Sequence, residues 1–287
     1  MDLKAEIKCN VERALAEDIG PGDLTARLIP PGETAIASVI SREHATLCGS
    51  GWFDACFHHL RPDTGVHWRI RDGMAVHPEQ ELCRISGNAR TLLTAERTAL
   101  NFLQLLSGVA TQTRRYVDAV AGTGAIVVDT RKTLPGLRLA QKHAVGCGGG
   151  VNHRMGLHDG VLIKENHIIA AGGIAAALAA ARNAAPPEVF IQIEVETLEA
   201  LRQALDADAA MVLLDNFSLQ DLRRAVRLNG ERPGRRAILE ASGGITLENI
   251  RAVALTGVDR ISVGSLTKDV RAIDLSLRFS THPLEKG

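Results

Sequence analysis

The stretch that decides the fold of this chain spans residues 189–216 and reads VFIQIEVETLEALRQALDADAAMVLLDN. It holds two short apolar runs, at 189–195 and 211–214, and each of them predicts a buried strand. The segment 198–206 between them has helical periodicity. A strand, a helix and a second strand in this order are typical of a parallel βαβ unit.

The same alternation fills the chain after residue 124. The apolar runs lie at 126–128, 161–163, 189–195, 211–214, 237–239 and 260–263. Helix-like stretches lie between most of them, at 175–183, 198–206 and 219–228. This alternation predicts a barrel or a wound parallel sheet, and periodicity alone does not decide which.

The first part of the chain has a different, α+β texture. Its helix-like and strand-like segments are 3–19, 37–40, 52–60, 66–70 and 90–121. We expect Ser107 and Gly108 to interrupt the last of these, and we place the domain boundary there. The predicted domains are therefore 1–108 and 109–287, with a C-terminal tail able to pack back on the N-terminal domain.

The composition excludes several classes of function. The 33 Lys and Arg balance the 33 Asp and Glu, and aromatic residues make up only 3% of the chain. We therefore expect neither nucleic acid nor a membrane as a partner. The five cysteines show no C-x-x-C spacing, which predicts free thiols in a reducing compartment. With no signal peptide and no apolar run long enough for a bilayer, we expect a cytoplasmic protein.

A charged residue follows each of the first five apolar runs, and Gly264-Ser265 follows the sixth. Because parallel strands end at one rim, these residues converge where barrel enzymes build their active sites. One polar residue at a strand end carries little information, since most strands end in something polar. Six in succession predict a functional site.

The signs of these charges indicate the ligands. Arg131, Lys132, Arg154 and Lys164 suit a polyanion. Glu194 and Asp215 suit sugar hydroxyls and a hydrated Mg²⁺ on a substrate phosphate. The last two runs are followed by the small residues typical of a phosphate site in barrels, namely Ser242, Gly243, Gly244, Gly264 and Ser265. Together they predict a phosphorylated sugar, a second anionic substrate and a divalent metal.

The histidines near this rim differ in what they suggest. His153 stands beside Arg154 and is a candidate site residue, whereas His158 and His167 are interpreted as structural. These three histidines lack the HExxH spacing and have no cysteine partners, so we expect no zinc site among them. The glycine-rich segment 146–150 predicts a turn rather than a phosphate loop, because no Gly-Lys-Ser/Thr ending follows it.

A series of short motifs follows in order along nearly the whole chain. They are LAEDIGPGDLT (15–25), ERTALN (96–101), TRKT (130–133), PGLR (135–138), GGGVNHR (148–154), IKENH (163–167), EVE (194–196), LDNF (214–217) and EASGGI (240–245). In this combination the chain resembles the quinolinate phosphoribosyltransferase family. The resemblance implies an N-terminal α/β sandwich followed by an incomplete α/β barrel of the seven-stranded type.

The resemblance also implies an activity and an assembly. Family members convert quinolinate and 5-phosphoribosyl-1-pyrophosphate to nicotinate mononucleotide, pyrophosphate and CO₂ in de novo NAD biosynthesis, with Mg²⁺ as cofactor. They form homodimers or hexamers with shared active sites, to which Arg97 would come from the neighbouring subunit.

Roles for individual residues follow from the same resemblance. Lys132, Glu194 and Asp215 would be catalytic, and the two acids would hold Mg²⁺, partly through substrate or water. The implied substrate-binding residues are Arg97, Thr130, Arg131, Lys132, His153, Arg154, Lys164, Glu194, Asp215, Ser242, Gly243, Gly244, Val263, Gly264 and Ser265.

Three alternatives remain open on the sequence. Lys164 could be the Schiff-base lysine of an aldolase, which requires apolar surroundings that depress its pKa. The fold could instead carry a non-catalytic phosphoribosyl or nucleotide sensor. Finally, a paralogue could act on another anionic acceptor, like the homologue encoded with molybdate transport. All of the implied substrate-binding and catalytic residues are present, which favours the quinolinate phosphoribosyltransferase over these alternatives.

Overall fold

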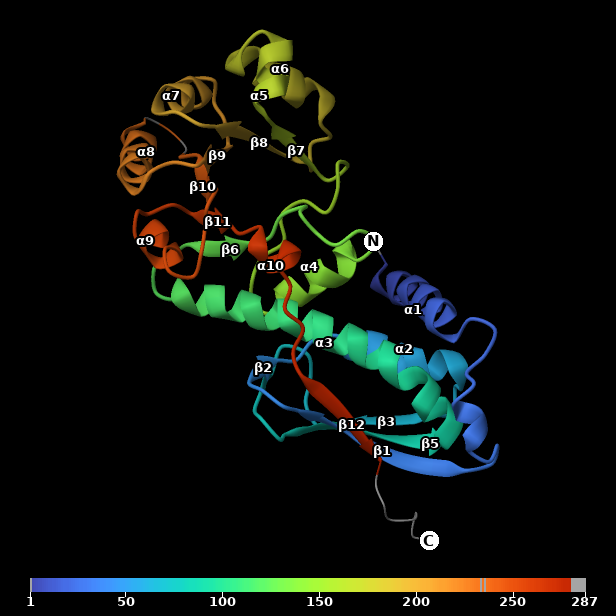
Figure 1. Ribbon diagram of the computed structural model, residues 1–287. Helices are drawn as coiled ribbons and strands as arrows, with labels where there is room; N and C mark the ends of the chain where they lie inside the picture. The colour runs from blue at the N-terminus through green and yellow to red at the C-terminus, as the bar shows by residue number, and fades with distance from the viewer. Residues whose placement is uncertain (1, 233, 235, 280–287) are drawn as a thin grey trace. The chain divides into compact units, whose positions relative to one another are not determined.

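The computed structural model describes residues 2–279 apart from 233 and 235 (Figure 1). The chain divides into two compact units. The first unit contains Met1–Arg114, Thr133–Gly149 and Thr267–Gly287, and the second contains Arg115–Lys132 and Gly150–Leu266. The chain thus passes between the units several times, whereas the sequence analysis placed a single boundary at residue 108.

The second unit is built on a parallel sheet of six strands. In chain order they are β6 (Ile126–Val128), β7 (Gly160–Ile163), β8 (Phe190–Val195), β9 (Met211–Asp215), β10 (Ile238–Ser242) and β11 (Arg260–Ser262). Their spatial order is β6-β11-β10-β9-β8-β7, and every neighbouring pair is parallel. Each predicted apolar run falls on one of these strands, so the expected parallel α/β architecture is confirmed.

The sheet of the second unit is open rather than closed. β6 and β7 are its two edges, and a single-residue parallel bridge joins Val151 to Val128 beside β6. Six strands and one bridge therefore stand where the seven strands of the family's barrel were expected. An incomplete barrel of this kind keeps the shared rim at the carboxyl ends of its strands.

Helices connect the strands of the second unit. They are α5 (Glu165–Ala171), α6 (Ile174–Ala184), α7 (Leu198–Asp206), α8 (Leu219–Glu231) and α9 (Ile250–Ala254). The α7 helix has the bounds that its sequence predicts, because the Thr197 side chain caps it by accepting the Ala200 N–H at 3.1 Å. Leu201 and Leu205 form its buried face. In the described part of the chain, no helix is both long and apolar enough to cross a membrane.

The first unit contains an antiparallel sheet in the order β12-β1-β5-β3. Its strands are β1 (Thr34–Ser41), β3 (Gly65–Trp68), β5 (Glu81–Asn88) and β12 (Leu275–Phe279), and a two-residue pair, β2 (Ala45–Thr46) and β4 (Ala75–Val76), lies apart from it. The remaining elements of this unit include α1 (Leu3–Ile19), a 3₁₀ turn η1 (Ala26–Leu28), α2 (Ser50–Leu60) and α4 (Arg138–Cys147). The α2 helix packs on the sheet through Phe53, whose ring lies 5.3 Å from that of Trp68. This is the predicted α/β sandwich.

The α3 helix (Ala89–Ala119) corrects one expectation, because it runs without a break through Ser107 and Gly108. Ser107 is fully buried and its hydroxyl bonds the backbone of Cys48, accepting the N–H at 2.9 Å and donating to the carbonyl at 3.0 Å. At Gly108 the backbone of Arg271 lies where a side chain would otherwise stand. These small residues therefore serve packing within the first unit and do not end the helix.

Gly108→Ala is therefore expected to destabilise the protein, although alanine normally favours a helix by about 1 kcal/mol over glycine. The added methyl group would overlap the Arg271 carbonyl, and such overpacking costs about 1–3 kcal/mol. Chemical denaturation measures the change. The control is Gly230→Ala, on an exposed position of α8 with open space around it, which should be neutral or stabilising. Equal effects of the two substitutions would contradict the close approach at Gly108.

Candidate active site

A cavity of about 380 Å³ opens at the carboxyl ends of the strands of the second unit. Its lining residues are Asp129, Thr130, Arg131, Lys132, His153, Arg154, Leu162, Lys164, Glu194, Leu213, Asp215, Glu240, Ser242 and Ser262. All six strands, or the loops that directly follow them, contribute residues, whereas His153 and Arg154 come from the segment between α4 and β7. The cavity therefore contains the predicted Thr130, Arg131, Lys132, His153, Arg154, Lys164, Glu194, Asp215 and Ser242.

The loop after β6 is held by short hydrogen bonds. Thr130 Oγ1 accepts the N–H of Lys132 at 3.0 Å, which closes a tight turn. Asp129 is fully buried, and its Oδ1 accepts the N–H of His153 at 2.9 Å. Asp129 thus ties this loop to the segment that carries His153, and the sequence analysis did not assign it a role.

His153 is fixed in one orientation at the edge of the cavity. Its Nδ1 accepts the N–H of Arg154 at 2.7 Å, so the ring proton lies on Nε2. Nε2 then donates to Oε1 of the buried Gln192 at 2.8 Å. His153 is itself buried, and both of its ring nitrogens are held by these hydrogen bonds.

Positive charge is concentrated around Arg154. One of its terminal nitrogens donates to the carbonyl of Gly160 at 2.9 Å, which holds the guanidinium in place. Burial, followed by the nearby positive charge of Arg131, lowers the pKa of Arg154. The Arg154 guanidinium has lost part of its hydration and lies near a second cation. An anion that binds between Arg154 and Arg131 would therefore stabilise both charges.

The acidic side of the cavity is organised by neighbouring side chains. Lys164 Nζ lies 3.2 Å from Glu194 Oε2, and Asn216 Nδ2 donates to Asp215 Oδ2 at 2.9 Å. Asn216 has a left-handed backbone with φ of 56°, and its N–H donates to the Ser242 carbonyl at 2.9 Å. Asn216 therefore joins the ends of β9 and β10 and orients Asp215.

Glu240 is a cavity residue that the sequence analysis missed as a site candidate. It is fully buried, and its Oε2 lies 3.0 Å from Arg260 Nε while its Oε1 lies 3.8 Å from His153 Nε2. The available signal was its position at the start of the EASGGI motif. Ser262, Leu162 and Leu213 were also missed, because nothing in a strand's sequence says which of its faces lines a cavity.

The predicted phosphate-binding residues lie in two loops that follow β10 and β11. Gly243 and Gly244 both have left-handed backbones, with φ of 92° and 60°. A side chain at Gly264 would lie 3.4 Å from Lys132 Cδ. The loop after β11 therefore lies beside the Lys132 side chain.

Several predicted residues lie outside the cavity lining. The N–H of Val263 donates to the Val128 carbonyl at 2.9 Å and its side chain is buried, so it holds β6 and β11 together. Ser265 Oγ lies 3.3 Å from the Tyr116 hydroxyl. Arg97 is exposed on α3, in the first unit. Contacts of these three residues with substrate remain predictions.

The fold and this cavity define an α/β-barrel enzyme for anionic substrates. The family model of the quinolinate phosphoribosyl transferase C-terminal domain matches residues 109–278, and that of the N-terminal domain matches residues 23–107. The chain therefore belongs to the quinolinate phosphoribosyltransferase family.

Individual relatives agree with this membership. The chain is 44% identical to nicotinate-nucleotide pyrophosphorylase [carboxylating] of Mycobacterium leprae, across 93% of this chain and 95% of the relative. It is 39% identical to the chloroplastic enzyme of the same name from Arabidopsis thaliana, across 100% of this chain and 85% of the relative. It superposes on the solved nicotinate-nucleotide pyrophosphorylase of Francisella tularensis with a TM-score of 0.93 and 43% identity, covering 98% of both chains.

Gly243→Ala is expected to lower the free energy of unfolding of the protein more than Gly244→Ala does. Both substitutions place alanine in a left-handed backbone, at a cost of about 1–2 kcal/mol. Only the methyl group at residue 243 would overlap Asn216, whereas the space at residue 244 is open. We expect an additional loss of about 1–3 kcal/mol for Gly243→Ala, measured by chemical denaturation. Equal losses would show that Asn216 does not pack against Gly243.

Proposed function

We propose that this chain is the decarboxylating quinolinate phosphoribosyltransferase of de novo NAD biosynthesis. It would convert quinolinate and 5-phosphoribosyl-1-pyrophosphate to nicotinate mononucleotide, pyrophosphate and CO₂. The observation that carries the proposal is the cavity of the second unit, which combines Arg131, Arg154 and Lys164 with Glu194 and Asp215 at one rim. Relatives with the names of this enzyme match nearly the whole chain.

The cationic side of the cavity suits quinolinate, which carries two adjacent carboxylates. Arg131 and Arg154 would each present a planar fork to a carboxylate, and Lys164 would add a point charge. His153, whose ring N–H is donated to Gln192, would hold the Arg154 backbone in position beside the carboxylates. Fixing the pyridine nitrogen against the anomeric carbon of the ribose removes the entropy cost of bringing two substrates together.

The acidic side would act on the ribose. Glu194 and Asp215 would accept hydrogen bonds from its hydroxyls, and their negative charge would stabilise the positive charge that develops on the sugar as pyrophosphate leaves. Lys132 would stabilise the negative charge on the departing pyrophosphate. The backbone at Ser242, Gly243, Gly244 and Gly264 would bind the 5-phosphate.

The carboxylates of the cavity also fit Mg²⁺. Glu194 and Asp215 offer oxygen ligands at an open rim, and Mg²⁺ prefers one or two carboxylates together with substrate phosphates and water. When bound, the ion would neutralise the pyrophosphate oxygens of the donor.

Decarboxylation would follow from the first step. Transfer of the ribose to the ring nitrogen makes the ring cationic, so it can accept the electron pair left when the 2-carboxylate departs as CO₂. A proton then replaces the carboxylate on the ring carbon. This sequence requires no organic cofactor.

The competing functions are less well supported. A Schiff-base lysine requires apolar surroundings, whereas Lys164 lies among charged side chains, with its Nζ 3.2 Å from Glu194 Oε2. The paralogue that acts on another anionic acceptor is not favoured, because the matched relatives carry the names of the quinolinate enzyme.

All five cysteines are free thiols, which supports a reducing, cytoplasmic location.

The experiment that tests the function is an assay of the purified chain with quinolinate, 5-phosphoribosyl-1-pyrophosphate and Mg²⁺. We expect nicotinate mononucleotide and CO₂ in equal amounts, with both products lost in EDTA and absent when nicotinate replaces quinolinate. If neither product forms while the phosphoribosyl donor still binds, the quinolinate assignment is wrong and another anionic acceptor must be sought.

Arg154→Ala is expected to raise the KM for quinolinate by about 10–100-fold, because it removes a charge-assisted hydrogen bond of about 1.5–3 kcal/mol. The KM for the phosphoribosyl donor should change little. Arg202→Ala is the matched control, since Arg202 is an exposed residue of α7 paired with Glu199. Steady-state kinetics measure both variants. An unchanged KM for quinolinate would show that Arg154 does not bind its carboxylates.

The assembly would be a homodimer or a hexamer in which Arg97 of one subunit completes the neighbour's site. Arg97→Ala and Asp215→Asn should then each lower kcat, by about 10²–10³-fold for the loss of a transition-state charge. When the two inactive variants are mixed by refolding, about half of the dimers contain one subunit of each kind. In each mixed dimer one of the two sites has both Arg97 and Asp215, so about a quarter of the wild-type activity should return. No recovery on mixing would show that Arg97 acts in its own subunit or not at all.

A further inference from the structure

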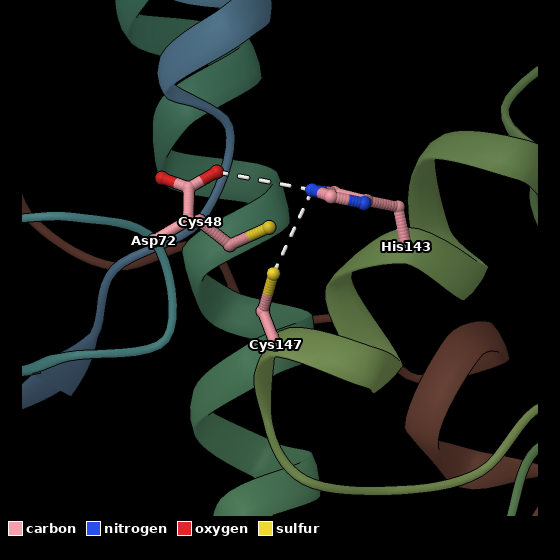
Figure 2. A group of neighbouring side chains, drawn as sticks. All are labelled: Cys48, Asp72, His143 and Cys147. Atoms are coloured by element: carbon pink, nitrogen blue, oxygen red, sulfur yellow. Dashed lines mark hydrogen bonds and ion pairs between the residues drawn. The ribbon is translucent and has the colours of Figure 1, made fainter. Parts of the chain in front are cut away.

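Four side chains with metal-binding atoms meet in the first unit, in a group that no step of the proposed reaction uses. They are Cys48, Asp72, His143 and Cys147, and their ligand atoms all lie within 4.8 Å of one another. Figure 2 shows the Asp72 carboxylate, the Cys48 and Cys147 sulfurs and the His143 ring converging on one point.

Three separate segments bring these side chains together. His143 and Cys147 lie one turn apart on α4, so they project from the same face of that helix. Cys48 precedes the start of α2 and Asp72 precedes β4. The group is not evident in the sequence, because only one of its spacings, His143 to Cys147, is local.

The distances within the group match the edges of a metal tetrahedron. Zinc bonds of about 2.0–2.3 Å to nitrogen, oxygen and sulfur imply ligand-to-ligand separations of about 3.3–3.8 Å. His143 Nε2 lies 3.6 Å from Cys147 Sγ and 3.8 Å from Asp72 Oδ2. The most distant pair, within 4.8 Å, would need to close by about 1 Å.

The surroundings hold three of these side chains in place. The Asp72 carboxylate accepts the N–H groups of Gly49 at 3.0 Å and Ser50 at 3.3 Å. Cys48 is fully buried and is anchored through its backbone by Ser107. The His143 ring packs against Trp52, with centroids 5.6 Å apart. Outer-shell contacts of this kind orient ligands in metal sites.

Without a metal ion the group forms a charged hydrogen-bonded network. Its bonds include the contact between His143 Nε2 and Cys147 Sγ and the ion pair between His143 Nε2 and Asp72 Oδ2. Because thiolates and neutral imidazole are the metal-binding forms, loading of the site would release the protons that these side chains carry.

We propose that Cys48, Asp72, His143 and Cys147 form a structural Zn²⁺ site in the first unit. Two thiolates and an imidazole suit zinc better than the oxygen-preferring Mg²⁺ of the proposed active site. Four protein ligands leave no open position, which is typical of a structural ion rather than a catalytic one. The site would cross-link α4 to the segments before α2 and β4, and it is independent of the proposed reaction.

The test is metal analysis of the full-length chain, purified under reducing conditions from zinc-supplemented cells. We expect one zinc per chain, and we expect Co²⁺ loaded in its place to show thiolate charge-transfer absorption and the visible bands of tetrahedral coordination. Cys147→Ser should weaken Zn²⁺ binding by at least about 100-fold, since even outer-shell changes cost 10–100-fold. It should also reduce the charge-transfer band, because only the Cys48 thiolate would remain.

The matched control is Cys9→Ser, which removes an exposed thiol on α1 away from the group and should keep the zinc. Asp72→Asn is a second variant that preserves side-chain shape, and it should weaken binding while the protein stays folded. A wild-type chain with neither zinc nor a cobalt–thiolate band would overturn the proposal. So would unchanged zinc content in Cys147→Ser, or a Cys48–Cys147 disulfide in freshly isolated protein, which would make the pair a redox couple instead.

Discussion

Parallel pairing in register is the constraint on which the proposed active site depends. Asp215 at the end of β9 pairs with Ser242 at the end of β10, and Val128 at the end of β6 pairs with Ser262 at the end of β11. Because the strands end together, residues separated by more than a hundred positions in sequence line one cavity. A shift of register by one residue would turn each of these side chains to the opposite face of the sheet.

The cavity gathers charges that would repel or neutralise one another if they were free to move. Hydrogen bonds to backbone groups fix two of them: Arg154 donates to the Gly160 carbonyl, and Asp129 is held by the N–H of His153. The side-chain amide of Asn216 holds Asp215. The site is therefore organised before substrate arrives, which reduces the reorganisation required in the transition state.

The first unit shows the same use of small and polar residues to fix segments. Ser107 and Gly108 suggested a break in the sequence, yet they let α3 pack closely against the backbone of Cys48 and Arg271. A serine–glycine pair in a helical sequence is compatible with a break in the helix or with close packing of the helix against another segment. The packing of the neighbouring segments decides which of the two occurs.

The elements of the barrel and most residues of the cavity can be predicted from the amino-acid sequence alone. The alternation of apolar runs and helical segments located all six strands of the second unit, because burial of a parallel strand requires a continuous apolar run. Arg131, Lys164 and Asp215 come after those runs, and Glu194 lies near the end of one of them. Only the tertiary structure decided that the fully buried Glu240 belongs to the cavity, and that Cys48, Asp72 and His143 meet Cys147. Such groups depend on the packing of segments distant in sequence, and local periodicity carries no information about which distant segments will touch.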